Sequence, residues 1–246
     1  MILGIIPARY ASTRFPGKPL VDLMGKTMIR RVFEQASKSR ALQKVVVATD
    51  DVRIQEEVLS FGGNVVMTAS THPSGTDRCL EALQQQDEHY DYVINIQGDE
   101  PFIDPAQIDL LAGLLQDGAT ELATLILPLT DPAVLFDDSK VKVVLNRHME
   151  ALYFSRMAIP WLKGVAQQDW PQHHAYYRHV GIYAYRADIL RRITALPVSP
   201  LEKAESLEQL RWLENGFRIK CAVTDHDSFC IDHPGDVEKV LQQYRS

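Results

Sequence analysis

The stretch of the chain that decides the fold is residues 5–20, which reads IIPARYASTRFPGKPL. An apolar run at residues 2–6 enters a loop of small residues that carries Arg9, Arg14 and Lys18. Small residues let backbone N–H groups approach a polyanion, and fixed cations neutralise it. The pattern favours a triphosphate-binding loop, with a plain basic surface loop as the alternative. Neither the Walker A pattern nor the dinucleotide fingerprint G-x-G-x-x-G is present.

Strands and helices alternate along the first half of the chain. Apolar runs at 2–6, 45–49, 64–68 and 92–97 predict strands, and apolar residues at helical spacing lie between them. This alternation predicts an α/β fold of three layers, with a mostly parallel, Rossmann-like sheet and helices on both faces. Ligands of such folds bind beyond the carboxyl ends of the strands, where the basic loop and Asp99 are both placed.

The second half of the chain is less regular and predicts a smaller, mixed β extension. Strand-like runs occur at 122–129, 141–146, 151–155, 179–185 and 217–224. Residues 157–178 have no clear period, so we expect a mobile loop there. A capping box that starts at Ser199, with Pro200 at the first helical position, predicts a helix that continues to Gly216. We expect Trp161, Trp170 and Trp212 to be packing residues.

Composition narrows the class of protein. A net charge of −6 over 246 residues argues against a general nucleic-acid binder, and no apolar run approaches the length of a membrane span. The three cysteines, Cys79, Cys221 and Cys230, have no metal-ligand spacing and predict buried thiols in a reducing compartment. The short apolar N-terminal run lacks the features of a signal peptide. We therefore expect a cytoplasmic enzyme with no nucleic-acid or membrane partner.

Two segments of the sequence, considered together, indicate a function that neither indicates alone. One is the basic loop, and the other is QGDEP at residues 97–101, which follows the apolar run 92–96. Together they resemble the sugar nucleotidylyltransferases, and within these the 3-deoxy-manno-octulosonate cytidylyltransferase (CMP-Kdo synthetase) family. The resemblance continues in order through VATD (47–50), SGTDR (74–78), ALYFSR (151–156), RHVGIY (178–183), LEQLR (207–211) and IDHP (231–234).

The resemblance implies a Mg²⁺-dependent transfer of CMP from CTP to the anomeric hydroxyl of 3-deoxy-manno-octulosonate (Kdo), with release of pyrophosphate, for lipopolysaccharide synthesis. It also implies a homodimer. Nucleotidyl transfer requires positioning and charge neutralisation more than covalent help from the protein. Mg²⁺ prefers carboxylate and phosphate oxygens, and the family's metal aspartates correspond to Asp99 and Asp232. Asp232 could instead cap a helix ahead of Pro234. The family's usual small residues before Asp232 are replaced by Phe229 and Cys230.

The resemblance also assigns the remaining site residues. The catalytic set comprises Arg9, Lys18, Asp99 and Asp232. The nucleotide-binding set comprises Ala8, Arg9, Ser12, Arg14, Lys18, Ser74, Gly75 and Arg78. The set for the sugar acid comprises Gln97, Arg156, His179, Tyr183, Glu208 and Gln209. The alternative for His179 and Tyr183 is that they are polar groups of a packed strand, although the site assignment is favoured, and Thr76 could cap a helix. The preference for cytosine comes from the family only.

On this basis we expect one nucleotidyltransferase domain over 1–246. Its nucleotide-binding half covers roughly 1–120, its acceptor and dimerisation lobe 121–225, and its metal aspartate and C-terminal helix 226–246. Alternatives within the class are a CMP-sialic acid synthetase, whose phosphate loop usually carries more glycine, and an enzyme specific for 8-amino-Kdo. From other classes, a non-catalytic nucleotide-binding protein is disfavoured by Asp99, Asp232 and Lys18 together, and a glycosyltransferase by the N-terminal phosphate loop.

Overall fold

The structure, a computed structural model, describes residues 1–11, 15–227 and 229–244 and divides into two compact units. Unit 1 is Met1–Ala112 with Ser228–Ser246, and unit 2 is Gly113–Asp227. The sequence places the corresponding limits near residues 120 and 225. None of the helices in the described ranges is long and apolar enough to cross a membrane.

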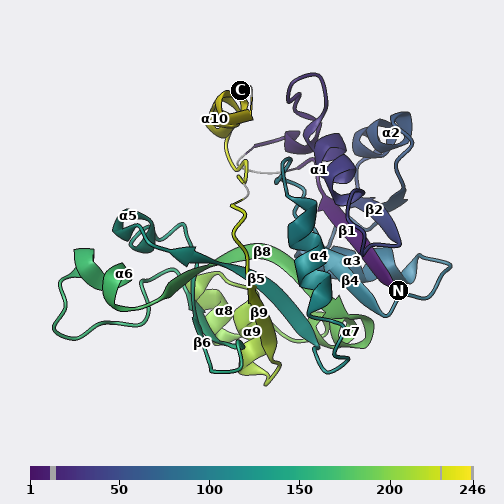
Figure 1. Ribbon diagram of the computed structural model, residues 1–246. Helices are drawn as coiled ribbons and strands as arrows, with labels where there is room; N and C mark the ends of the chain where they lie inside the picture. The colour runs from purple at the N-terminus through teal and green to yellow at the C-terminus, as the bar shows by residue number, and fades with distance from the viewer. Residues whose placement is uncertain (12–14, 228, 245–246) are drawn as a thin grey trace. The chain divides into compact units, whose positions relative to one another are not determined.

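Unit 1 is built on four parallel strands (Figure 1). They are β1 (Ile2–Ala8), β2 (Lys44–Thr49), β3 (Val65–Met67) and β4 (Tyr92–Asn95), in the order β3-β2-β1-β4. The central strand β1 pairs on both sides, with Ile5 opposite Val46 on β2 and Asn95 on β4. Strands buried on both faces are nearly continuous apolar runs, as the sequences of β1 and β2 are.

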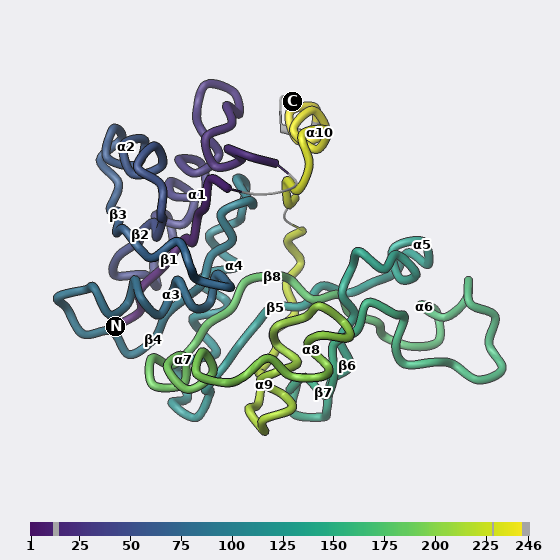
Figure 2. The backbone as a smooth tube through the Cα atoms, turned by 180° about the vertical axis from the view of Figure 1, so that it is seen from behind, coloured from purple at the N-terminus to yellow at the C-terminus, as the bar shows by residue number. Residues whose placement is uncertain are grey.

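Four helices connect or flank these strands (Figure 2). They are α1 (Met28–Ala36), α2 (Val52–Ser60), α3 (Gly75–Gln84) and α4 (Pro105–Gly113). Right-handed crossovers place α1 and α2 on one face of the sheet and α3, which returns the chain from β3 to β4, on the other. Asp109 of α4 accepts hydrogen bonds from Ser39 Oγ at 2.5 Å and Ala41 N at 3.2 Å, just after α1. The predicted three-layer arrangement is confirmed in this unit.

The C-terminal segment completes unit 1. Helix α10 (Pro234–Tyr244) contributes Val240 to an apolar cluster with Leu23 and Met28, next to Ile231 of the preceding segment. All four side chains are fully buried. Burial of each such side chain stabilises the fold by about 1.5–3 kcal/mol relative to exposure, so this cluster anchors the segment that carries Asp232.

Unit 2 is the mixed β extension that the sequence predicts. Its strands are β5 (Leu122–Leu129), β6 (Lys142–Leu145), β7 (Ala151–Ser155), β8 (Tyr176–Arg186) and β9 (Ile219–Val223). Their order is β9-β5-β8-β6-β7, in which only the β5 and β9 pair is parallel among the described pairings. The helices are α5 (Pro132–Leu135), α6 (Trp170–His173), α7 (Ala187–Thr194), α8 (Pro200–Glu205) and α9 (Gln209–Glu214).

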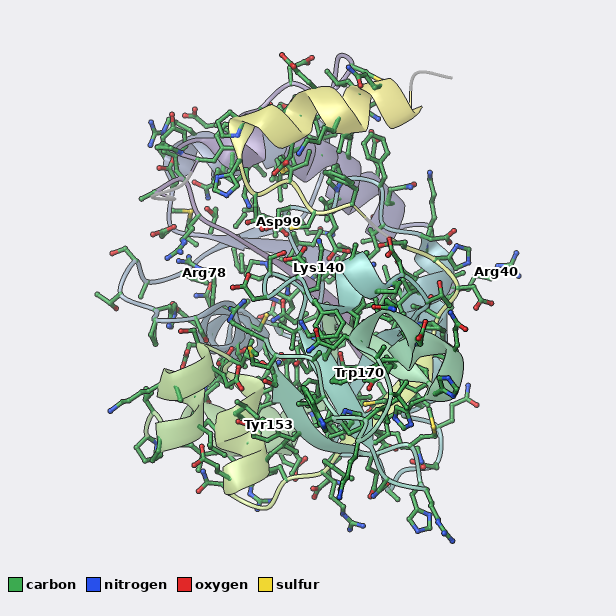
Figure 3. The ribbon with its side chains drawn as sticks, turned by 90° about the vertical axis from the view of Figure 1, so that its left-hand side faces the viewer. Arg40, Arg78, Asp99, Lys140, Tyr153 and Trp170 are labelled. Atoms are coloured by element: carbon green, nitrogen blue, oxygen red, sulfur yellow. The ribbon has the colours of Figure 1, made fainter. Side chains whose placement is uncertain are left out.

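Two expectations about unit 2 are wrong in their boundaries. Residues 157–178 include α6 and the beginning of β8, and the fully buried indole of Trp170 (Figure 3) packs against Leu135 and Tyr176. The helix that starts with the predicted capping box at Ser199 ends at Glu205, because Ser206 adopts a left-handed backbone conformation with φ of 54°. A second helix, α9, follows this break.

Three side-chain expectations also need correction. Trp161 packs edge to face on Trp170 at 4.8 Å but is 69% exposed, whereas Trp170 and Trp212 are buried. Cys230 is exposed, unlike Cys79 and Cys221. The cap of α3 is Ser74, one residue before the helix, and not Thr76.

Candidate active site

The QGDEP loop brings Asp99 to the carboxyl edge of the unit 1 sheet. A Cβ atom on Gly98 would lie 2.9 Å from the backbone oxygen of Pro7, so only glycine permits this approach of the loop to the end of β1. Asp99 follows immediately and lies beside the chain that leads into α10 (Figure 3). The position agrees with the rule that places ligands beyond the carboxyl ends of parallel strands.

Lys18 lies at the centre of a charged cluster. Its Nζ donates to Asp99 Oδ2 at 2.7 Å and to the backbone oxygen of Ile231 at 2.9 Å, and it lies 3.9 Å from Asp232 Oδ1. Lys18 begins a single 3-10 turn that follows Gly17, whose φ is 73°. The backbone N–H of Gly17 donates to Tyr10 O at 3.0 Å and closes the basic loop.

Asp232 reaches this cluster because its segment is attached to the QGDEP loop. The backbone N–H of Ile231 donates to Asp99 O at 3.0 Å. At the start of α10, Asp236 Oδ2 accepts the N–H groups of Asp232 and His233 at 3.2 and 2.9 Å. One donor atom each from Asp99, Asp232 and Cys230 lies within 4.8 Å of the others. These three side chains could hold a metal ion.

A cleft of about 260 Å³ adjoins the cluster within unit 1. Its walls include eight of the predicted residues: Ala8, Arg9, Lys18, Ser74, Gly75, Arg78, Gln97 and Asp99. The predicted Ser12 and Arg14 lie outside the described residues. Other lining residues were not predicted: Pro7, Pro19, His72, Pro73 and Gly98. Pro7, Pro19 and Gly98 lie within the quoted stretches 5–20 and 97–101, and His72 and Pro73 directly precede SGTDR, so their neighbours in these motifs were the available signal.

The amino end of α3 forms one wall of the cleft. Ser74 Oγ accepts from Asp77 N at 3.2 Å and donates to Asp77 Oδ2 at 2.6 Å. A Cβ atom on Gly75 would lie 3.3 Å from Pro7 Cγ, so the first turn packs tightly on the end of β1. Unpaired N–H groups and the helix dipole make a helix amino end favourable for an anion.

Arg78 is directed into the protein. Its Nη1 donates to Thr68 Oγ1 at 2.6 Å and lies 3.4 Å from Asp50 Oδ1, and its side chain is 5% exposed. These contacts tie α3 to the residues that follow β2 and β3. Arg78 lines the cleft, but its described contacts fix the wall rather than extend into the opening.

In unit 2, His179 and Tyr183 lie on β8 beside an irregularity of the β5–β8 pairing. The register shifts between Thr124 and Leu125, and Thr124 Oγ1 donates to Ile182 O at 2.7 Å. The same oxygen lies 3.0 Å from His179 Nε2. The Thr124 hydroxyl also lies 3.1 Å from Val180 O, and the imidazole of His179 can donate or accept a hydrogen bond. Burial, then the charge of Arg178, lowers the pKa of His179 to about 3.

Tyr183 and Trp212 present polar atoms that lack partners. Their rings meet edge to face at 5.2 Å, and the imidazole of His179 lies 5.1 Å from the Tyr183 ring. Within the described part of the chain, the buried Tyr183 hydroxyl and Trp212 Nε1 have no hydrogen-bond partner. Burial raises the pKa of Tyr183 well above its usual value, so the hydroxyl remains a donor. Buried polar atoms without partners are rare and indicate a ligand or an ordered water.

Arg156 is held by Glu205. Arg156 N donates to Glu205 Oε2 at 2.9 Å, and Arg156 Nε donates to Glu205 O at 2.8 Å. Ser155 Oγ donates to Glu205 Oε1 at 2.6 Å. Sequence reasoning missed Glu205, which joins the end of α8 to the end of β7.

Glu208 and Gln209 lie at the start of α9. Gln209 is the first residue of α9 and is 6% exposed, which corrects the expectation of a position in the middle of a longer helix. Glu208 Oε1 accepts from Arg211 Nη2 at 2.9 Å. Arg211 Nη1 donates to Leu196 O at 3.0 Å, so the guanidinium that holds the Glu208 carboxylate is itself held in place.

Comparison with known proteins agrees with this arrangement. The family model described as "Cytidylyltransferase" matches residues 3–219. The 3-deoxy-manno-octulosonate cytidylyltransferase of Parabacteroides distasonis is 54% identical over 243 residues, covering 97% of this chain and 96% of that protein. The protein of that name from Cytophaga hutchinsonii is 54% identical over 240 residues, covering 97% and 96%.

A solved structure gives the same result. The structure of CMP:2-keto-3-deoxy-manno-octonic acid synthetase complexed with CTP superposes with a TM-score of 0.92 at 41% identity, over 99% of this chain and 98% of that one. None of these comparisons favours the sialic acid or 8-amino-Kdo alternatives. The chain belongs to the cytidylyltransferase family, among the 3-deoxy-manno-octulosonate cytidylyltransferases.

Proposed function

We propose that this protein transfers CMP from CTP to the anomeric hydroxyl of 3-deoxy-manno-octulosonate and releases pyrophosphate. The observation that carries the proposal is the cluster of Lys18, Asp99 and Asp232 at the edge of a cleft lined by the phosphate loop. The names and the identity of the relatives, 54% over nearly the whole chain, support the two substrates. The product would supply lipopolysaccharide synthesis.

The cleft in unit 1 is the proposed CTP site. Arg9 and Lys18 would neutralise the triphosphate, since both line the cleft and Lys18 is a mobile point charge. The amino end of α3 at Ser74 and Gly75 would add backbone N–H groups. Ser12 and Arg14 complete the set as sequence predictions.

The proposed acceptor residues of unit 2 offer complementary hydrogen-bonding groups. The imidazole of His179 can donate or accept, and the buried Tyr183 hydroxyl has no partner among the described residues, and both groups suit sugar hydroxyls. Arg156 suits a carboxylate because its guanidinium is held in place, with Nε donating to Glu205 O at 2.8 Å and Nη1 to Asp138 O at 3.3 Å, and a fixed guanidinium pairs well with a carboxylate. Glu208 and Gln209 complete the proposed acceptor residues of unit 2, and Gln97, in the cleft of unit 1, stays in the set as a sequence prediction.

Mg²⁺ is the proposed cofactor. The residues fit it: two carboxylates converge, and the Lys18 ammonium already lies between them as a cation. When bound by Asp99 and Asp232, Mg²⁺ would neutralise charge that develops on the phosphate oxygens. Within the protein, Asp99 and Asp232 would hold the ion in place, and Lys18 would stabilise the negative charge of the leaving pyrophosphate.

A homodimer in the cytoplasm is the proposed working form. The proposal of a dimer rests on the family resemblance. Light scattering at several protein concentrations tests the dimer.

Pyrophosphate release tests the function. The protein is assayed with each of the four ribonucleoside triphosphates crossed with Kdo, 8-amino-Kdo and sialic acid, with and without Mg²⁺. We expect release only with CTP, Kdo and Mg²⁺ together. Efficient release with sialic acid, or equal release with all nucleotides, would contradict the proposal.

A further inference from the structure

Cys230 places a thiol beside the proposed metal aspartates. It precedes Ile231, whose N–H donates to Asp99 O, and its side chain is exposed. Across the described ranges, Asp99, Cys230 and Asp232 form the one group of three or more His, Cys, Asp or Glu side chains whose donor atoms lie within 4.8 Å of one another.

A cation already lies at this place. The Lys18 ammonium is 2.7 Å from Asp99 Oδ2, 2.9 Å from Ile231 O and 3.9 Å from Asp232 Oδ1. The converging oxygens therefore hold positive charge without the help of the thiol. Because a lysine side chain is flexible, its head group can leave when a stronger cation arrives.

The three donors differ in their metal preference. Carboxylate oxygens suit Mg²⁺, which does not favour sulfur, whereas a thiolate selects softer ions such as Zn²⁺ and Cd²⁺. We propose that Cys230 converts the carboxylate pair into a site that captures a thiophilic divalent cation through one sulfur and two carboxylate oxygens. The inference rests on the proposed function in that Asp99 and Asp232 are the residues proposed to hold Mg²⁺.

Binding of the metal ion to Cys230 replaces the thiol proton. A sulfur–metal bond forms, the thiol proton passes to the buffer, and the Lys18 ammonium gives up its contact with Asp99 and turns to solvent or to phosphate. The same carboxylates cannot serve both ions at once. Zn²⁺ or Cd²⁺ therefore displaces Mg²⁺ and inhibits turnover at concentrations far below those of Mg²⁺.

Cd²⁺ titration followed by ultraviolet sulfur-to-cadmium charge-transfer absorption tests the site without reference to activity. The wild type should show the band with one Cd²⁺ per chain. Cys230→Ser should lose the band and bind Cd²⁺ at least about tenfold more weakly, as loss of a ligand costs no less than loss of an outer-shell partner. The affinity of the same variant for Mg²⁺, measured by competition with Mn²⁺, should stay within about twofold of the wild-type value. Cys79→Ala, which removes a buried thiol, is the matched control and should keep the band.

The outcomes separate the two proposals. A wild type without the band, or a Cys230→Ser variant that keeps it, overturns the thiolate site even if Mg²⁺ and CTP turnover is normal. A wild type that shows the band but releases no pyrophosphate with Mg²⁺, CTP and Kdo keeps the thiolate site and overturns the proposed function. Circular dichroism confirms that each variant is folded, and Cys230→Ala provides a second thiol-free variant.

Discussion

Lys18 and Asp99 form a close ion pair, with Nζ 2.7 Å from Oδ2, although 81 positions separate them in the sequence. The lysine side chain is 14% exposed and the aspartate side chain 22%. The ammonium contacts one proposed metal ligand directly and lies within 3.9 Å of the other. A metal ion would therefore compete with Lys18 for Asp99, and the triphosphate would compete with Asp99 for Lys18. Release of this pair is part of the proposed loading of the site.

Asp99→Asn should keep the fold and lose most of the turnover. It removes a carboxylate from a charge-dominated transition state, which costs a few kcal/mol, or about two orders of magnitude in rate. Steady-state pyrophosphate release at saturating Mg²⁺ measures the effect, with circular dichroism as the folding control. Near wild-type turnover would remove Asp99 from the metal site.

Lys18→Ala should weaken CTP binding far more than sugar binding. It deletes one cation from the cleft and leaves the acceptor residues of unit 2 unchanged. Titration calorimetry with CTP and with Kdo measures both affinities, and Lys203→Ala, which removes an exposed lysine, is the control. Unchanged CTP affinity with lost sugar affinity would show that the two sites have been assigned in reverse.

His179→Ala and Gln209→Ala should each act mainly on the sugar acid. A lost hydrogen bond to a hydroxyl or carboxylate costs about 1–3 kcal/mol, and more where a buried partner is left unpaired. The loss should appear in kcat/KM for Kdo while KM for CTP stays near normal. Normal sugar kinetics together with a lower melting temperature would identify both residues as structural polar groups.

Glu205→Ala should raise KM for the sugar acid by roughly tenfold, because it removes the acceptors that fix Ser155 and Arg156 and costs about 1–2 kcal/mol in positioning. Glu205→Gln keeps one carbonyl acceptor and should recover part of the effect. KM for CTP is the internal reference, and Glu56→Ala on the exposed side of α2 is the matched control. Equal losses for both substrates would point to a general loss of stability instead.

His179 should make stability fall in mild acid. Its pKa is lowered to about 3 in the fold, whereas an unfolded histidine titrates near 6.5, so only the unfolded chain takes up this proton between those values. The stability that the neutral His179 contributes is fully present above about pH 6.5. It is lost as the pH falls toward about 3, at up to about 1.4 kcal/mol per pH unit. Urea unfolding at several pH values measures the slope. His179→Asn should reduce it, and His173→Gln, at an exposed position, should not.

Much of the fold could be predicted because its signals are local. The apolar runs mark β1, β2 and β7 within two residues, since a buried strand is specified by its own side chains. The capping box places the start of α8 at Pro200 for the same reason. The family resemblance rests on short motifs of this kind, so the cytidylyltransferase assignment was also available from the sequence.

A single backbone conformation and contacts between distant residues decided the rest. Ser206 interrupts an otherwise helical pattern through its own backbone conformation, and Trp170 orders a segment without period because its indole is buried between Leu135 and Tyr176. Neither leaves a periodic signal.

The site depended on tertiary structure most of all. The sequence by itself determined which residues carry the charges, Lys18, Asp99 and Asp232. Only the fold decided that they converge, because Gly98 lets its loop approach β1 and the N–H of Ile231 attaches the C-terminal segment to Asp99. Those are contacts between residues far apart in the chain, and no local pattern encodes the distance that they fix. The same pairing places the Cys230 thiol among the carboxylates.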